Sequence, residues 1–161
     1  ILQKTAPDIC FVFLGGGLEV DQLKQQTVSK LLTNVVFLAP VPMTEVGNML
    51  HAADVLLVHL RKSPLFSITI PSKTQAYMAV GKSIIMAVDG DAASLVKEAD
   101  CGVIALSEDP VSIAEAALTL YRLPLEKRQV IAQNSKYFYQ EKLSLQAGVS
   151  RFGEIFKSLS V

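Results

Sequence analysis

The chain has 161 residues, half of them hydrophobic, and its fifteen basic residues are balanced by fifteen acidic ones. This length and composition fit one packed globular domain and exclude a disordered chain. The even charge provides neither a basic stripe for nucleic acid nor a polybasic cluster for an anionic membrane.

The start of the chain and its cysteines indicate the kind of protein and the cellular compartment to expect. The chain begins at Ile1 rather than Met, and residues 1–7 are typical of a helix that runs into a turn, so we expect the sequence to start inside a larger protein. It has no signal peptide and no apolar stretch of the ~18 residues that a membrane span needs, so we expect a cytoplasmic protein. Cys10 and Cys101 are isolated and are expected to be buried thiols. With only His51 and His59 besides, no metal site can be assembled by spacing.

Short apolar segments alternate with amphipathic ones along the chain. Strand–helix alternation with short turns is the signature of an open parallel sheet that carries helices on both faces. We therefore predict a single α/β domain over residues 1–161 with a Rossmann-like sheet and a C-terminal helix at 143–158. The predicted strands are 10–14, 34–38, 54–60, 83–88 and 102–106, and the other predicted helices are 18–32, 44–53, 72–80, 92–99, 110–121 and 125–140.

Ligands of such sheets bind beyond the carboxyl ends of the strands, so the turns that follow the strands are the candidate sites. The first is Gly15-Gly16-Gly17, where backbone can approach a ligand closely because glycine has no Cβ. The motif is neither G-x-G-x-x-G nor a P-loop, and a bare tight turn fits it equally well.

The second turn runs from Ser63 to the start of a helix at Ser72. Ser72 and Gln75 have the S-x-x-Q spacing of a capping box. A helix start presents free backbone N–H groups that suit a phosphate. Lys73 in the first turn opposes the helix dipole unless an anion lies nearby, so it is a candidate phosphate contact, with a solvated lysine as the alternative.

Further candidates come from the same turn and from the turn after the fourth strand. Phe66 and Ser67 could line the loop, although Phe66 could equally fill the core. Asp89-Gly90-Asp91 places two carboxylates at a strand end, where Asp91 suits the cap of the next helix. His59 ends a buried strand on the ligand side. No Ser-His-Asp or Cys-His arrangement can be built, so no catalytic residue is assigned.

Five segments follow one another in an informative order: FVFLGGG, NVVFLAPVP, HAADVLLVHL, IPSKTQAYMAVGKSIIMAVDGDAASLVKEADCGVIA and DPVSIAEAAL. In this order they resemble the C-terminal domain of family-four glycosyltransferases, which are GT-B-type enzymes with two Rossmann domains. The resemblance covers nearly the whole chain, is most specific over YMAVGKSIIMAVDGD, and is closest to bacterial transferases that build surface polysaccharides. It implies that the first strand region and the N-terminal domain lie outside the chain.

The resemblance also implies a chemistry. Such enzymes transfer a sugar from a nucleotide-sugar to an acceptor with retention at the anomeric carbon, usually without a bound metal, and the donor lies mainly on the C-terminal domain. Carried onto this sequence, the Gly15-Gly16 turn would approach the donor, and the loop at Val41 would contact the base through backbone groups. The segment from Ser67 to Lys73 would hold the diphosphate. We expect a UDP-linked donor and no cofactor, with His59, Asp89 and Asp91 on the side of the donor sugar.

The sequence departs from the family pattern at two glutamates that are separated by seven residues. Their positions fall on Ile68 and Ala76, so neither carboxylate is present, and Gln75 is the nearest polar substitute. Gly81-Lys82-Ser83 replaces the usual Gly-x-Pro. The family's basic pair that clamps the diphosphate would precede residue 1, so Lys73 is expected to carry more of the diphosphate binding.

The expected function is therefore donor binding within a retaining glycosyltransferase, inactive alone, whose acceptor is a polysaccharide or a lipid-linked sugar. A lipid-linked acceptor would bring the full-length enzyme to the inner face of the membrane. Two alternatives remain at this point. A sugar-nucleotide 2-epimerase would need cleft carboxylates and a histidine, for which Asp89, Asp91 and His59 are available. A non-catalytic α/β binding module, such as a phospho-receiver domain, would need an acidic cluster where Gly15–Gly17 stand.

Overall fold

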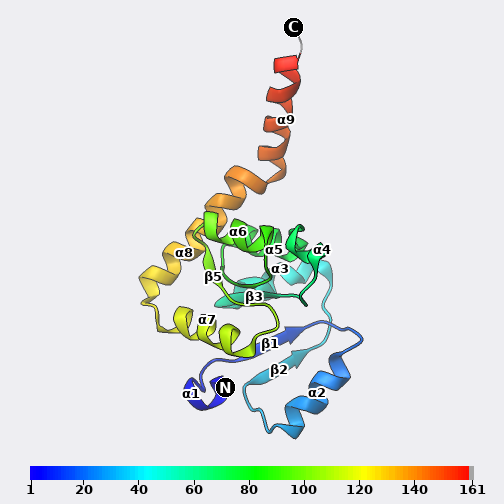
Figure 1. Ribbon diagram of the computed structural model, residues 1–161, viewed down its shortest axis with the longest axis vertical. Helices are drawn as coiled ribbons and strands as arrows, with labels where there is room; N and C mark the ends of the chain where they lie inside the picture. Colours follow the sequence, from blue (N-terminus) through cyan, green and yellow to red (C-terminus); the bar gives the residue numbers. More distant parts are fainter. Residues whose placement is uncertain (160–161) are drawn as a thin grey trace. The chain divides into compact units, whose positions relative to one another are not determined.

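The computed structural model describes residues 1–159. Contacts between Cα atoms divide the chain into two compact units, Ile1–Met49 and Leu50–Val161. The strands pair in parallel in both units, and helices follow them along the chain, as Figure 1 shows. The predicted α/β class with parallel strands is confirmed.

The first unit contains a parallel pair of strands. Valine, phenylalanine and leucine fill both strands, as suits a pleated and partly buried surface. Phe13 stacks on Phe37 of the neighbouring strand, with the ring centroids 5.2 Å apart. The elements of this unit are α1 (Leu2–Thr5), β1 (Phe11–Leu14), α2 (Val20–Ser29) and β2 (Val35–Leu38), and α3 (Met43–Ala52) leads into the next unit.

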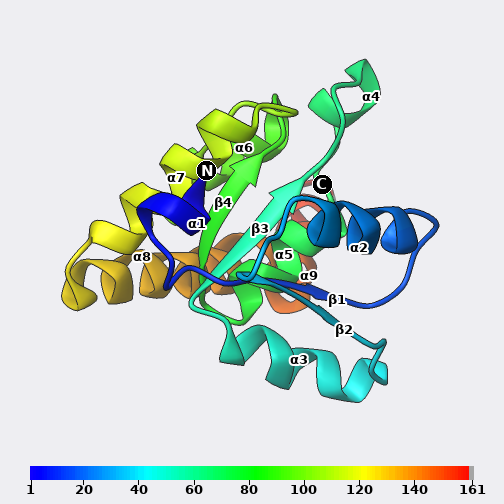
Figure 2. The same cartoon turned by 90° about the horizontal axis from the view of Figure 1, so that it is seen from below.

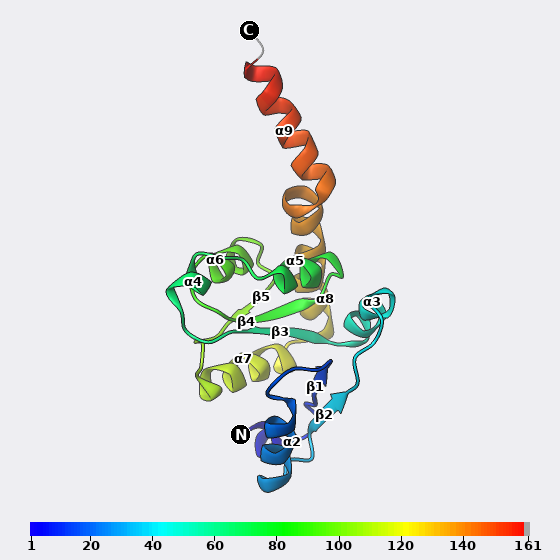
Figure 3. The ribbon, with the colours of Figure 1, turned by 90° about the vertical axis from the view of Figure 1, so that its right-hand side faces the viewer.

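The second unit is built on a parallel sheet whose order is β3-β4-β5. Figure 3 shows α5 and α6 on one face of this sheet and α7 on the other, which confirms helices on both faces. The strands are β3 (Val55–His59), β4 (Ser83–Ala87) and β5 (Gly102–Ile104), and the helices are α4 (Pro64–Ser67), α5 (Ser72–Ala79), α6 (Asp91–Glu98), α7 (Pro110–Arg122), α8 (Leu125–Phe138) and α9 (Leu145–Leu159), with a π-helix, η1 (Tyr139–Leu143), before α9.

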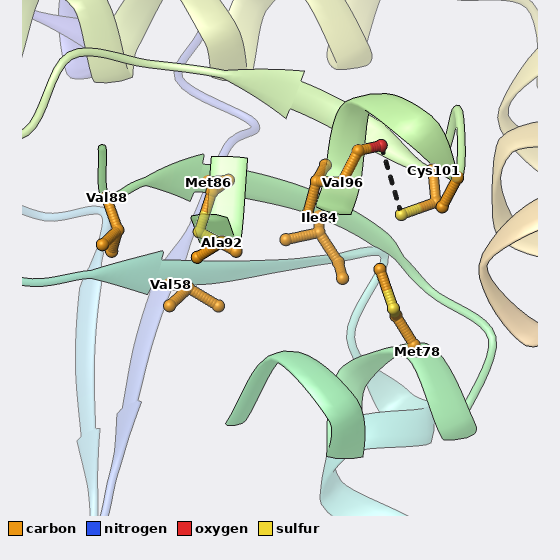
Figure 4. Packing of buried hydrophobic residues seen from close by; sticks show 9 residues of the cluster. Val58, Met78, Ile84, Met86, Val88, Ala92, Val96 and Cys101 are labelled. Carbon is orange, nitrogen blue, oxygen red and sulfur yellow. Dashed lines mark hydrogen bonds between the residues drawn. The ribbon is translucent and has the colours of Figure 1, made fainter. Parts of the chain in front are cut away.

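The core of the second unit surrounds β4. Every residue of this strand is buried, because β3 and β5 flank it on both edges and helices cover both faces. Met78 of α5 and Val96 of α6 pack against it from the helix side (Figure 4). The cluster consists of Val58, Met78, Ile84, Met86, Val88, Ala92, Val96, Ala99 and Cys101.

Three local predictions are wrong. The N-cap of α5 is Pro71 rather than Ser72, and the N-cap of α6 is Gly90 rather than Asp91, with no side-chain cap bond in either helix. Ser72 and Asp91 are already the first helical residues, so their side chains are not in the N-cap position from which capping occurs. Cys10 is exposed because it lies before β1 and outside any packed core, whereas Cys101 is buried as predicted.

Two absences apply to residues 1–159. None of the helices there combines the length and the apolar character that a membrane crossing needs. No group of histidine, cysteine and carboxylate side chains in that part of the chain could hold a metal ion.

Burial raises the pKa of the Cys101 thiol from 9.0 to about 11, and the neighbouring Asp100 carboxylate adds to the rise. The unfolded chain then loses this proton at lower pH than the folded one, so the stability that depends on the protonated thiol is present below pH 9 and is lost as the pH rises toward 11. We predict that the free energy of unfolding falls over this interval, with a slope of up to about 1.4 kcal/mol per pH unit from Cys101. Denaturant titrations of wild type and Cys101→Ala measure this contribution as a difference in slope.

Cys10→Ala serves as the matched control, because Cys10 is exposed and its removal leaves the buried thiol in place. A Cys101→Ala slope equal to that of wild type would contradict the prediction.

Candidate functional site

A pocket of about 310 Å³ lies at the carboxyl ends of β3, β4 and β5, within the second unit. Figure 2 shows the arrowheads of β3 and β4 pointing toward the side where α4 lies. Parallel strands bring their carboxyl ends to one edge, so turns that are distant in sequence converge there. The lining residues are Arg61, Lys62, Ser63, Pro64, Phe66, Ser67, Val88, Asp89 and Ser107.

The turn after β3 supplies the positive charge of the pocket. Arg61 and Lys62 occupy the short loop between the end of the strand and the cap of α4. Ser63 is that cap, and its hydroxyl accepts the N–H of Leu65 at 3.3 Å. Pro64 at the first helical position fixes φ for the helix start. Arg61 and Lys62 therefore lie on a short loop that ends at the capped start of α4.

Hydrogen bonds join the turn after β5 to the other two turns. The backbone N–H of Lys62 donates to Oε2 of Glu108 at 2.8 Å. The hydroxyl of Ser107 donates to Oδ2 of Asp89, also at 2.8 Å. Glu108 adopts a φ of 60°, a left-handed conformation that non-glycine residues rarely take. The geometry of the pocket thus depends on hydrogen bonds between the turns that follow separate strands.

Gly90 brings the turn after β4 against α4. Its φ is 81°, and a Cβ added there would clash with the backbone carbonyl of Ser67. Only glycine allows this approach, because every other residue would place a side-chain carbon inside that carbonyl. The turn after β4 and the end of α4 can therefore lie in close contact.

The lining is suited to a ligand that carries both negative charge and hydroxyl groups. Arg61 and Lys62 contribute two positive charges, and Asp89 contributes one negative charge. Guanidinium and ammonium groups donate charge-assisted hydrogen bonds to phosphate or carboxylate oxygens. The Asp89 carboxylate accepts hydrogen bonds only, and it retains acceptor capacity beyond the bond from Ser107.

The structure brings together three of the residues predicted from sequence: Phe66, Ser67 and Asp89 line the pocket. His59, Ser72, Lys73, Gln75 and Asp91 belong to the same unit but do not line it, and all five are exposed. Gly15, Gly16 and Val41 belong to the first unit, where Gly15 follows β1 and accommodates a φ of 116°.

Sequence reasoning missed the basic pair and Ser107. Arg61 and Lys62 follow a predicted strand almost directly, and Ser107 is the first residue after another. The rule that pointed to the turns therefore also pointed to these residues. A charged pair in a loop also fits a solvated surface, so the sequence alone does not distinguish these residues.

We predict that Gly90→Ala disturbs the pocket and lowers stability. The positive φ alone costs about 1–3 kcal/mol for a residue with a Cβ, and the clash with the Ser67 carbonyl adds to this cost. Denaturant unfolding and the amide spectrum of residues 61–67 measure both effects. Gly148→Ala in α9 is the control, since a Cβ there meets open space and alanine favours a helix. A Gly90→Ala protein with wild-type stability and spectrum would contradict the prediction.

Comparisons with known proteins place this geometry in context. The family model described as "Glycosyl transferases group 1" matches residues 1–138. No curated protein sequence matches the chain.

Solved structures share the fold. The chain is similar to the Anabaena protein HepE in complex with UDP, with a TM-score of 0.79 and 19% identity over 98% of this chain and 43% of HepE. HepE is also known in complex with UDP-glucose. Sucrose-phosphate synthase from Thermosynechococcus elongatus gives a TM-score of 0.74 and 18% identity over 92% of this chain and 38% of that enzyme.

The C-terminal domain of a glycosyl transferase group 1 family protein (LpcC) from Francisella tularensis gives a TM-score of 0.71 and 19% identity, over 89% of this chain and 74% of that domain. At these identities the likeness shows the fold alone, which is that of GT-B glycosyltransferases. The chain spans less than half the length of HepE and of the sucrose-phosphate synthase.

Proposed function

The chain belongs to the group 1 glycosyltransferases, and we propose that residues 1–161 form the domain that binds the nucleotide diphosphate-sugar donor. The observation that carries the proposal is the pocket at the carboxyl ends of β3, β4 and β5, whose lining combines Arg61 and Lys62 with hydroxyl groups and Asp89. Both parts of such a donor, an anionic diphosphate and a hydroxyl-bearing sugar, have matching partners there.

This chemistry suits glycosyl transfer, in which the nucleoside diphosphate leaves with increasing negative charge. Cations and backbone N–H groups that are already in place stabilise that charge without reorganising during the reaction. The start of α5 and Lys73 would add to the cations of the pocket, since free N–H groups at a helix start favour an anion.

We propose UDP as the nucleotide carrier. HepE, which shares the fold, forms complexes with UDP and with UDP-glucose. The resemblance assigns the turn at Gly15 and Gly16 to the donor and the loop at Val41 to the base. Ser72 and Gln75 belong to the same donor-facing helix start, and His59 and Asp91 lie toward the sugar.

The finer assignment rests on the resemblance to family-four enzymes. It proposes transfer with retention at the anomeric carbon, without a metal cofactor, to a polysaccharide or a lipid-linked acceptor in the cytoplasm or at the inner face of the membrane. The acceptor would bind to a further domain of the full-length enzyme, and closure of that domain would exclude water from the reaction. The chain alone would then bind the donor without transferring sugar.

We predict saturable binding of UDP to the chain in calorimetric titration, with weaker binding of GDP and ADP. The base would be distinguished by backbone groups, while the diphosphate would contribute equally in all three ligands. Absence of binding by all three nucleotides would contradict the donor-binding function. Preference for GDP or ADP would contradict UDP as the carrier and leave donor binding in place.

Lys73→Ala is predicted to weaken UDP binding by about 1.4-fold to fivefold, because an exposed ionic contact contributes about 0.2–1 kcal/mol. The same titration with uridine, which has no phosphate, is the control and should give equal affinities for variant and wild type. Equal UDP affinities would remove Lys73 from the diphosphate site.

A further inference from the structure

Glu108 lies in the turn after β5 and outside the lining of the pocket, yet its side chain contacts the loop of Arg61 and Lys62 after β3. We propose that Glu108 is a positioning residue, which holds this basic loop in place through the backbone N–H of Lys62 and so strengthens binding of the donor diphosphate. The inference rests on the proposed donor-binding function and adds to it a residue that acts through another.

The backbone of Glu108 adopts an unfavourable conformation, with a φ of 60°. Two other non-glycine residues within residues 1–159 have a positive φ, Leu31 and Asp100. Each of these lies directly after the C-cap of a helix, α2 or α6, where a left-handed residue commonly ends the helix. Glu108 ends no helix, since it follows a strand and precedes α7. Its left-handed conformation therefore needs another explanation, and strain of this kind is typical of functional sites.

The residues on both sides of Glu108 are fixed by their own side chains. The hydroxyl of Ser107 donates to Oδ2 of Asp89 at 2.8 Å. Oδ1 of Asp109 caps α7 by accepting two backbone N–H groups, at 2.9 and 3.0 Å. Neither contact uses the side chain of Glu108, whose Oε2 accepts the N–H of Lys62 at 2.8 Å. The neighbouring contacts determine the turn, and the turn directs the carboxylate toward the basic loop.

The charge of Glu108 works against an anionic ligand. A carboxylate beside the basic loop repels a diphosphate, and solvent and salt only weaken that repulsion at an exposed residue. A glycine at this position would have neither the strain nor the repulsion. What glutamate supplies, and glycine lacks, is an acceptor that reaches from one turn to the next. The bond to Lys62 is therefore the property of Glu108 that favours binding.

This bond restrains the basic loop between two fixed ends. His59 ends β3 on the upstream side, and Ser63 caps α4 on the downstream side. The contact with Glu108 adds a fixed point between them. Arg61 and Lys62 then lose less conformational freedom when an anion binds, and a smaller loss of freedom gives a higher affinity.

The test uses three substitutions of Glu108 in the full chain. Glu108→Gln keeps a carbonyl oxygen that can accept the N–H of Lys62, and it removes the charge. Glu108→Ala removes the acceptor and keeps a Cβ at the unfavourable φ. Glu108→Gly removes the acceptor and adopts the same φ without steric cost, so its unfolding midpoint in denaturant should lie above that of Glu108→Ala. Calorimetric titrations with UDP and with inorganic pyrophosphate measure binding, and hydrogen exchange of the Lys62 amide reports on the bond.

We expect Glu108→Ala and Glu108→Gly to bind both ligands about twofold to tenfold more weakly than wild type, the range that loss of one hydrogen bond gives. Glu108→Gln should bind both at least as tightly as wild type, because it keeps the acceptor and removes the repulsion. The Lys62 amide should exchange faster in the alanine and glycine variants and at the wild-type rate in the glutamine variant. A residue that acted only through stability would instead give Glu108→Gly a higher affinity than Glu108→Ala.

Glu115→Ala is the matched control, since it removes the same charge from an exposed position on α7 outside the pocket lining. Its affinities for UDP and pyrophosphate should equal those of wild type. A loss of affinity in this variant as large as that in Glu108→Ala would overturn the positioning role, because the loss would then follow from charge alone.

The outcomes separate this inference from the proposed function. If wild type binds UDP and the alanine and glycine variants of Glu108 bind it equally well, the positioning role is overturned and donor binding stands. If wild type binds pyrophosphate but no nucleotide, and both variants bind pyrophosphate more weakly, the role stands and nucleotide binding fails. Binding of neither ligand by wild type would overturn both. Equal weakening by Glu108→Gln and Glu108→Ala would overturn the bond to Lys62 as the cause.

Discussion

The complete burial of β4 is the constraint on which the second unit depends. Every residue from Ser83 to Ala87 is removed from water, so the strand needs a hydrogen-bonded neighbour on each edge and a helix layer on each face. Parallel pairing on both edges follows, and it brings the ends of β3, β4 and β5 to the same side. The pocket is therefore a consequence of the core, because residues that leave three adjacent parallel strands have to meet there.

The pairing of β3, β4 and β5 places the three turns that follow them near one another. Contacts between these turns then fix their geometry. Gly90 lets the turn after β4 touch the carbonyl of Ser67, and Glu108 reaches from the turn after β5 to the N–H of Lys62. Gly90 adopts its positive φ without strain because it has no Cβ, whereas the positive φ of Glu108 stores strain that the surrounding packing has to offset. The two contacts thus fix the turns in different ways, one by close approach and the other by a hydrogen bond from a strained residue.

Periodicity was sufficient to predict the α/β class, the order of the elements and the turns that carry the pocket, because burial on one or both faces leaves a direct pattern in sequence. Periodicity did not predict the N-cap residues of α5 and α6. A serine or an aspartate at the start of an amphipathic segment can be the N-cap or the first helical residue, and the sequence pattern is the same in both cases. Cys10 was misplaced for a related reason: an apolar run beside it does not reveal where the packed core ends. The pocket brings Arg61 and Lys62 near Ser107, although these residues lie about 45 positions apart in the sequence. They meet only because β3 and β5 belong to one sheet, so the spacing of residues along the chain does not predict the group.

The pocket also bears on the departure from the family pattern. Where the resemblance places two glutamates, this chain has Ile68 and Ala76, and both are exposed. A carboxylate close to a diphosphate repels it unless a hydroxyl group separates the two charges, so losing both glutamates lowers the energetic cost of bringing an anion to this edge. Arg61 and Lys62 add attraction at the same edge, while Asp89, oriented by Ser107, keeps one carboxylate for hydroxyl groups. Recognition of the donor would then depend less on carboxylates that read hydroxyl groups and more on cations that hold the phosphate.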